Sequence, residues 1–372
     1  MKLINLELKN YRNCKSILLD FNSDKTLIIG KNAQGKTNIL ESVYYLSSLK
    51  NLRALNNSEL INFDENEFQI HGTVLKSETE IEMDYYYDRD KKRETKLNKV
   101  KTTPKNFKTV LKTVLFASTD LSLVRGTPQD RRNWLDNAVS QIYPAYDERL
   151  SKYDKIRIQK NNLLKEDYID QNLLNVYNEQ LVISGSNIIF LRNKYLKEIE
   201  KIAREKHKDI SQNEEFSLKY IHPYFEAEEE VSDDINVIAE NFAKQLELTK
   251  DEEIRRKQSC CGPHRDDIIF YINNTDASKY ASQGQQRTIV LALKLAEIVM
   301  IKNKTGHSPI LLLDDVLAEL DDLRQNYLLK SISSNTQTII TSVDTLLFDE
   351  EFLKDVAIYN IEQGQLKAGN VQ

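Results

Sequence analysis

The chain has 372 residues, of which 40% are hydrophobic and 29% charged, and its formal net charge at pH 7 is −5. This length suggests about two domains, and the modest acidity excludes a protein that coats nucleic acid indiscriminately, so any DNA contact should be a local patch. The three cysteines, Cys14, Cys260 and Cys261, form no CxxC pair, which excludes a disulfide framework and favours a reducing cytoplasm. Neither a signal peptide nor a membrane-spanning helix is recognisable, so we expect a cytoplasmic protein without a membrane partner.

The first predicted elements are two strands and a helix. Apolar and polar residues alternate over residues 3–8, and the apolar run 27–29 follows a turn, so both segments are predicted to be strands. The second strand runs directly into the loop 30–37. After that loop, apolar residues recur at helical spacing over 39–46, which predicts a helix.

The loop between that strand and that helix has the sequence GKNAQGKT, a full match to GxxxxGK[ST]. Its glycines allow the backbone to wrap around a phosphate, and its N–H groups and the positive end of the helix favour an anion. Lys36 would act catalytically on the β- and γ-phosphates of ATP, and the Thr37 hydroxyl would bind Mg²⁺. The residues predicted to hold the nucleotide are Gly30, Lys31, Asn32, Ala33, Gln34, Gly35, Lys36, Thr37 and Asn38.

A hairpin is predicted over residues 68–88, and a strongly basic segment follows it. Between Lys91 and Lys108 there are eight basic residues and one acid, Glu94. Such a segment can bind DNA phosphates, but a solvated hairpin tip is the more ordinary role of a charge run. Both roles stay open.

The character of the chain changes over residues 118–254, which are predicted to form a mostly helical arm domain inserted into an α/β head. Apolar residues recur there at helical spacing, and charges fill the other faces. The acidic run 226–234 is interpreted as a solvated loop. Arg125, Arg131 and Arg132 form a second basic site, for which DNA contact and a structural role stay open.

Strands and helices alternate again after the arm, with strands predicted over 268–272, 310–313 and 338–341 and helices from about 283 and 323. The head should therefore be one α/β domain built from two distant segments, 1–117 and 255–372.

The strand over 310–313 ends in two carboxylates, Asp314 and Asp315. An apolar strand with this ending is the Walker B arrangement, in which Asp314 would hold Mg²⁺ and Asp315 would act as the general base for the attacking water. Aspartate is also common where a strand simply stops at a turn. The presence of the phosphate loop favours the functional interpretation.

The sequence SQGQQR opens the helix that precedes this strand. The residues Ser282, Gly284 and Gln285 could do no more than cap a helix. The functional alternative is an ABC signature, in which Ser282 and the N–H of Gly284 donate to the γ-phosphate held by a second copy of the chain. Ser282 is then a third catalytic residue.

The turn GPHRDD contains His264, Arg265 and Asp266. These three residues could form a catalytic cluster or a salt-bridged corner that fastens the arm. We favour a structural role or an inter-domain hinge.

Taken together, these motifs resemble the bacterial RecF family of recombinational repair proteins, relatives of the SMC-type heads. The matching segments are LKNYRN (8–13), GKNAQGKTNILE (30–41), VLFASTDLSLVRGTPQDRRNWLD (114–136), GPHRDD (262–267), SQGQQRT (282–288) and LLLDDVLAELD (311–321). They cover most of the chain in order. Ala33 departs from the glycine that such loops usually carry, and FASTDL departs from a usual Pro-Glu pair.

The resemblance implies an ATP-dependent homodimer that binds double-stranded and gapped DNA, hydrolyses ATP weakly under DNA stimulation, and works with RecR and RecO in loading RecA. It implies that Arg12 touches a nucleotide phosphate and that residues 319–321 form a D-loop at the dimer seam. Thr341 and Ser342 stand at the switch position, where transporters usually carry histidine. Since neither can carry its proton, and Asp315 is shorter than the usual glutamate, we predict slow turnover.

Three other classes are weaker. An ABC transport cassette would require a better signature and a switch histidine. A structural SMC-like ATPase would require sustained heptads in the arm, and a small-molecule kinase would have no use for the signature.

Overall fold

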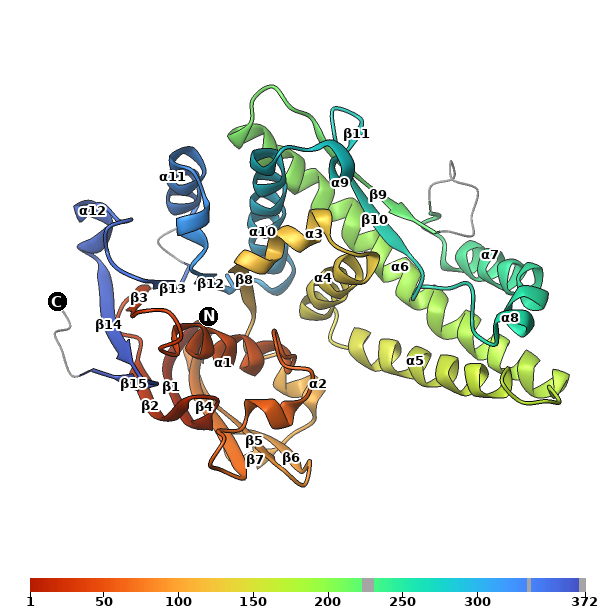
Figure 1. The fold of residues 1–372 in the computed structure, drawn as a ribbon, viewed down its shortest axis with the longest axis horizontal. Helices are drawn as coiled ribbons and strands as arrows, with labels where there is room; N and C mark the ends of the chain where they lie inside the picture. Colours follow the sequence, from red (N-terminus) through yellow and green to blue (C-terminus); the bar gives the residue numbers. More distant parts are fainter. Residues whose placement is uncertain (223–230, 333–335, 368–372) are drawn as a thin grey trace. The chain divides into compact units, whose positions relative to one another are not determined.

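The computed structural model describes residues 1–222, 231–332 and 336–367, so residues 226–230 of the acidic run lie outside the described residues. The chain divides into two compact units, which we call the head unit (Met1–Asp120 with Glu297–Gln372) and the arm unit (Leu121–Ala296) (Figure 1). Compactness alone defines these units. The domain limits 1–117, 118–254 and 255–372 therefore stay a prediction.

The head unit contains a sheet in the order β15-β14-β3-β13-β12-β8. Its strands are β3 (Lys25–Ile29), β8 (Thr113–Ala117), β12 (Ile310–Asp314), β13 (Thr338–Ser342), β14 (Val356–Glu362) and β15 (Gln365–Leu366). All pairs are parallel except β14 with β15. The central strands are apolar and almost wholly buried, as expected for a parallel sheet covered on both faces. Because the strands run parallel, the carboxyl ends of β3, β13 and β12 share one edge.

A second, antiparallel sheet of the head unit has the order β2-β1-β4-β5-β6-β7. Its strands are β1 (Lys2–Tyr11), β2 (Cys14–Asp20), β4 (Glu67–Lys76), β5 (Thr79–Asp88), β6 (Arg93–Leu97) and β7 (Val100–Lys101). Helix α1 (Lys36–Ser48) contacts strands of both sheets, and 11 of its 13 residues are buried. Burial on all sides fixes α1 firmly, and with it the end of the phosphate loop.

Short helices complete the head unit: η1 (Asn57–Leu60), α2 (Pro104–Phe107), η2 (Ser118–Leu121), η3 (Val316–Glu319), α11 (Asp322–Ser331) and α12 (Glu350–Leu353). Asp321 caps α11 by accepting a hydrogen bond from the Arg324 N–H.

The arm unit is mostly helical, as predicted. Its helices are α3 (Ser122–Arg125), α4 (Pro128–Ile142), α5 (Tyr146–Leu163), α6 (Gln171–Ile210), α7 (Ile235–Leu248), α8 (Lys250–Arg256), α9 (Ala277–Tyr280) and most of α10 (Gln283–Thr305). The 40-residue α6 is the spine of the unit, since α4, α5, α7 and the strand β9 (Phe216–Ile221) all pack against it. Among the described residues, no helix is both long and apolar enough to cross a membrane.

One predicted strand has a different neighbourhood from the one expected. The strand predicted over 268–272 is β10 (Asp267–Ile272), but it pairs with β9 and β11 (Thr275–Asp276) of the arm unit and not with the parallel sheet of the head unit. Its side chains alternate between buried and half-buried. That alternation is typical of an antiparallel strand with one solvated face, whereas a strand of a covered parallel sheet is apolar throughout.

Candidate functional site

The phosphate loop connects β3 to α1 and ends on a left-handed glycine. Gly35 has φ +110° and precedes the first residue of α1. An added Cβ there would lie 2.9 Å from Asn13 Oδ1, so both the backbone and the space require glycine. Ala33 is also left-handed, at φ +64°. A single residue in that region costs about 1–2 kcal/mol, which the surrounding fold can sustain, so the loop keeps its shape despite this departure from glycine.

The Lys36 ammonium lies inside the loop. Its Nζ donates hydrogen bonds to the carbonyl oxygens of Gly30 (2.7 Å) and Lys31 (3.4 Å). It is also 3.7 Å from Asp315 Oδ2. The side chain is 4% exposed, so a fixed positive charge stands in the loop beside the end of β12.

Thr37, Asp314 and Thr341 meet at the carboxyl edge of the parallel sheet. Asp314 Oδ1 accepts hydrogen bonds from the hydroxyls of Thr37 and Thr341, each at 2.9 Å. Burial raises the pKa of Asp314 above its ordinary value, although the hydroxyls of Thr341 and Thr37 favour the charged form. The predicted phosphate-loop and Walker B residues are thus brought together.

This pair of oxygen ligands fits Mg²⁺. Thr37 Oγ1 and Asp314 Oδ1 are hard donors, and Mg²⁺ in nucleotide sites takes one or two protein ligands together with waters and phosphate oxygens. No group of three or more His, Cys, Asp or Glu side chains suited to a metal occurs in the described part of the chain.

Asp315 leaves the strand in a left-handed conformation, at φ +51°. Its N–H donates to Thr341 Oγ1 at 3.0 Å, and its side chain is 40% exposed. Thr341 is 2% exposed and bonds to both aspartates of the Walker B strand. Thr341, predicted at the switch position, therefore holds the carboxylate of Asp314 and the backbone of Asp315, a role that a hydroxyl can fill without a titrating proton.

The guanidinium of Arg12 is held by a buried carboxylate of α1. Its Nε and Nη2 donate to Glu41 Oε2 and Oε1 at 2.6 and 2.9 Å, and the Glu41 side chain is fully buried. A second arginine, Arg53, contacts Glu41 Oε2 at 3.4 Å and Asn38 Oδ1 at 3.0 Å. Two positive charges therefore converge beside the first turn of α1, where Arg12 alone was predicted.

The sequence interpretation missed Glu41, Arg53 and Asn13. Glu41 sits in the apolar face that also contains Ile39, Leu40 and Val43, and an acid on such a face is a readable sign of a buried ion pair. Arg53 and Asn13 carry no such sign, because only the fold brings them to the loop. Asn13 accepts a hydrogen bond from Asn38 Nδ2 at 2.7 Å.

The signature segment forms a reciprocal cap at the start of α10. The N–H of Ser282 donates to Gln285 Oε1 at 2.8 Å, and the N–H of Gln285 donates to Ser282 Oγ at 3.2 Å. Ser282 is exposed and Gly284 is half-buried. Ser282 and Gln285 therefore do cap α10. Because Ser282 is exposed at a helix N-terminus, its hydroxyl is also accessible to an anion.

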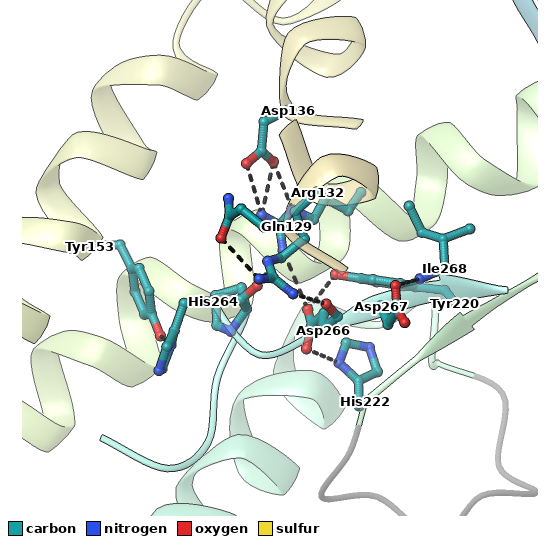
Figure 2. Close-up of polar contacts among 12 residues, drawn as sticks. Gln129, Arg132, Asp136, Tyr153, Tyr220, His222, His264, Asp266, Asp267 and Ile268 are labelled. Carbon is teal, nitrogen blue, oxygen red and sulfur yellow. Dashed lines mark hydrogen bonds and ion pairs between the residues drawn. The ribbon is translucent and has the colours of Figure 1, made fainter. Parts of the chain in front are cut away.

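The GPHRDD turn belongs to a buried polar network of the arm unit (Figure 2). Asp266 accepts hydrogen bonds from Tyr220 Oη at 2.5 Å and His222 Nδ1 at 2.7 Å. Arg192 donates to both carboxylate oxygens of Asp136 at 2.9 and 3.0 Å, and to the Pro263 carbonyl at 2.6 Å. Burial opposes ionisation of Asp266, but His222 and Arg192 hold the pKa of that carboxyl below its ordinary value.

His264 is tied into the same unit through both ring nitrogens. Nδ1 lies 2.6 Å from Tyr153 Oη (Figure 2) and Nε2 lies 3.4 Å from the Ser259 carbonyl, while Arg265 Nη2 donates to that same carbonyl at 3.3 Å. Internal partners thus engage all three residues of the motif, which supports the structural role over the catalytic one.

We expect His264 to make the chain acid-sensitive. Burial, with Arg157 nearby, lowers the pKa of His264 from 6.5 to about 3, so between these values the unfolded chain binds a proton that the folded chain does not. Stability is therefore lost as the pH falls below 6.5, by about 2 kcal/mol at pH 5. Urea unfolding at pH 7 and pH 5 should show this loss in the wild type and a smaller one in His264→Gln; equal losses would contradict it.

Two of the three arginines of the second basic site are used internally. Arg131 is 8% exposed and forms two hydrogen bonds with Asp267, at 2.6 and 2.9 Å. Arg132 Nη1 donates to the Asp266 carbonyl at 2.6 Å. These contacts favour the structural role for both residues, and leave Arg125, which is exposed, as the remaining candidate for DNA contact.

The basic segment between Lys91 and Lys108 is partly neutralised. Lys96 and Lys101 pair with Glu94 at 3.4 and 2.8 Å, and Lys99 pairs with Glu82 at 3.8 Å. A cluster that we call the β5–β6 basic cluster stands apart from these pairs: it comprises Lys91, Lys92 and Arg93, all exposed. DNA contact by this segment stays a prediction, and these three residues are its best candidates.

Comparisons with known proteins agree with this geometry. The family model described as RecF/RecN/SMC N terminal domain matches residues 2–367. Two similar proteins are each named "DNA replication and repair protein RecF". That of Bacillus subtilis (strain 168) is 39% identical, with 98% of this chain and 100% of the relative covered. That of Streptococcus gordonii (strain Challis) is 40% identical, with 99% and 100% covered.

Solved structures agree as well. A structure described as the recombination mediator protein RecF-ATP in the RecFOR pathway matches with a TM-score of 0.89 and 32% identity, covering 98% of this chain and 96% of that one. An SMC head bound to the C-winged helix domain of ScpA matches with a TM-score of 0.54 at 16% identity, covering 99% and 96%, and so shows likeness of fold alone. The predicted fold class, an α/β ABC-type P-loop ATPase head with an inserted, mostly helical arm, is confirmed.

Proposed function

The chain belongs to the RecF family of DNA replication and repair proteins, and we propose that it is an ATP-dependent, DNA-binding protein of recombinational repair and replication restart. One observation carries the nucleotide site: Lys36 lies within the phosphate loop while Thr37 and Asp314 are joined at 2.9 Å. A fixed ammonium and a pair of hard oxygen donors are the groups that a magnesium–triphosphate complex requires.

In this proposal each residue of the site has its own role in ATP hydrolysis. Thr37 and Asp314 would hold Mg²⁺, whose charge would offset the negative charge of the phosphate oxygens. The loop N–H groups and Lys36 stabilise the charge that builds on the transferred phosphoryl group. Asp315 orients the attacking water and accepts its proton. Because Asp315 is short and partly paired with Lys36, turnover is slow, as suits a protein whose product is a conformational state.

The second half of each nucleotide site comes from another copy of the chain. Ser282 Oγ and the N–H of Gly284, at the exposed start of α10, would donate to the γ-phosphate bound by the partner. Residues 319–321 would lie at the same seam. ATP binding then joins two heads, and hydrolysis separates them. Arg12 and Arg53 would complete the charge around the nucleotide at the first turn of α1.

The relative with bound ATP is described as a recombination mediator of the RecFOR pathway. By family membership we propose double-stranded and gapped DNA as the platform, RecR and RecO as partners, and RecA loading as the outcome. The β5–β6 basic cluster would supply sequence-independent contacts to DNA phosphates.

The experiment that tests the DNA part is charge reversal. Replacing Lys91, Lys92 and Arg93 by glutamate should weaken binding to duplex DNA at least about tenfold and flatten the dependence of the binding constant on salt by roughly two to three units of slope, since up to three phosphate contacts are lost. Binding is measured by fluorescence anisotropy between about 50 and 200 mM salt.

The matched control replaces Lys96, Lys99 and Lys101, which already pair with Glu94 and Glu82. Replacing these three lysines by glutamate changes the net charge by the same amount as the first variant but removes fewer cations that lack an acidic partner. If both triple variants weakened DNA binding equally, only a general effect of net charge would remain. If the salt dependence were unchanged in both, the segment would be a solvated hairpin without DNA contact. Stimulation of ATP hydrolysis by duplex DNA separates the repair function from a transport cassette or a kinase.

A further inference from the structure

The turn between β14 and β15 lies against the phosphate loop, although more than 300 residues separate them in the sequence. The N–H of Gly364 donates to the Gln34 carbonyl at 2.9 Å, and the N–H of Gln363 donates to Gln34 Oε1 at 2.6 Å. Gln363 and Gly364 both have positive φ, +50° and +73°, as a two-residue hairpin turn of this hand requires. Two backbone donors thus hold one loop residue.

The turn is itself fixed from behind. β14 lies beside β3, the strand that leads into the loop (Figure 1). The two strands pair in parallel, and this pairing extends to Asn360 opposite Ile29. Ile361 is 3% exposed and belongs to the core of the head unit. A Cβ on Gly364 would lie only 2.1 Å from the backbone oxygen of Asn13. The strand that leads into the turn is therefore anchored in the core by Ile361, and the turn itself packs closely against the backbone of Asn13.

Holding the Gln34 carbonyl also sets the direction of the next N–H. In a trans peptide the C=O of one residue and the N–H of the following residue point in opposite directions, and the described residues contain no cis peptide bond. With its oxygen directed at the turn, the peptide between Gln34 and Gly35 directs the Gly35 N–H away from the turn. That N–H is one of the loop donors from which a phosphate cradle is built.

We propose that the Gln363–Gly364 turn is a positioning element of the nucleotide site, which holds the Gln34–Gly35 peptide in its phosphate-binding orientation. The inference rests on the proposed ATP site and adds a part that no motif of the sequence contains. A loop held in its bound conformation does not have to be ordered when the triphosphate arrives, so the turn increases affinity without touching the ligand.

The test compares two glycines with the same backbone strain. Gly364 has φ +73° and Gly306 has φ +75°, but a Cβ on Gly306 meets nothing within 4 Å. Gly364→Ala should raise KM for ATP about tenfold and leave kcat at saturating ATP unchanged, because contacts of the loop act on ground state and transition state alike. Gly306→Ala should change neither constant. A loss of folded protein alone would instead lower kcat and leave KM as it is, which would overturn the inference.

A second variant keeps the inference testable if Gly364→Ala does not fold. Gln34→Met conserves volume and removes the acceptor of the Gln363 N–H. The loss of one hydrogen bond should raise the Kd of a fluorescent ATP analogue roughly three- to tenfold, with the melting temperature of the nucleotide-free protein unchanged. An unchanged Kd in Gln34→Met would overturn the inference. If Lys36→Ala also left ATP binding unchanged, the nucleotide site itself would be wrong, and that outcome is distinct from failure of the turn.

Discussion

Replacing Lys36 by alanine should lower the affinity of the chain for ATP by at least about 100-fold and abolish ATP-dependent dimerisation. Each hydrogen bond from an ammonium to a phosphate oxygen contributes roughly 1.5–3 kcal/mol, and about 2.7 kcal/mol corresponds to a factor of 100. The Lys36 side chain is 4% exposed and lies 3.7 Å from Asp315, whereas Lys31, the other lysine of the loop, is exposed. Binding is measured by titration with ATP and Mg²⁺, and dimerisation by light scattering at saturating nucleotide.

Lys15→Ala is the control for the loss of a lysine. Lys15 is on β2 of the same unit, and its ion pair with Asp64 is exposed on both sides. It should therefore leave affinity and dimerisation near those of the wild type. A dimer of Lys36→Ala at ordinary ATP concentrations would overturn the assignment of the loop, whereas equal defects in both variants would point to a general loss of folding.

The parts of this site that could be predicted are those written in consecutive residues. Residues 30–37 and the pair Asp314 and Asp315 each follow an apolar strand, and parallel strands bring their carboxyl ends to one edge. Local sequence thus predicted both residues of the proposed cation site, although 277 residues separate Thr37 from Asp314.

Contacts that depend on tertiary packing were not predictable in this way. Arg53 lies in a loop whose residues show no regular spacing, so its contact with Glu41 could not be predicted. The strand β14, apolar at Val356, Ala357 and Ile358, was not predicted either. Without β14 there was no means of seeing that a turn near the C-terminus supports Gln34. The same limit explains Arg131, whose partner Asp267 is 136 residues away and which looked equally suitable for DNA.

The strand β10 shows a different kind of error. Its position was predicted, but its partner strands were not, since β-strand character alone does not name a neighbour. Burial alternates along Ile268, Phe270 and Ile272 in the structure, but Ile269 between them is also apolar, so the sequence shows this alternation only in part. Period-2 burial is typical of an antiparallel sheet with one solvated face, and the observed pairing of β10 with β9 and β11 is what assigns the strand to the arm unit.

Asp315→Asn should stop ATP hydrolysis and preserve ATP binding, so that an ATP-bound dimer accumulates. Asparagine has the same shape and tolerates the left-handed backbone of this position, at φ +51°. The N–H bond to Thr341 Oγ1 involves only the backbone and persists. What the variant loses is the base for the attacking water, a contribution of about 10²–10⁴ in rate. Hydrolysis is followed by phosphate release, and the dimer by its mass in solution with ATP and then with duplex DNA.

Asp64→Asn removes an exposed carboxylate of the same unit and should hydrolyse ATP at the wild-type rate. Unchanged hydrolysis in Asp315→Asn would remove Asp315 from the role of base and leave Thr341 and Asp314 to orient the water. A doubling of mass that captures DNA would place the exposed Ser282 at a seam between two chains, because a capped helix alone gives no reason for dimerisation to depend on ATP. If the chain stayed a monomer under all conditions, Ser282 would act only as a helix cap, through its hydrogen bonds with Gln285.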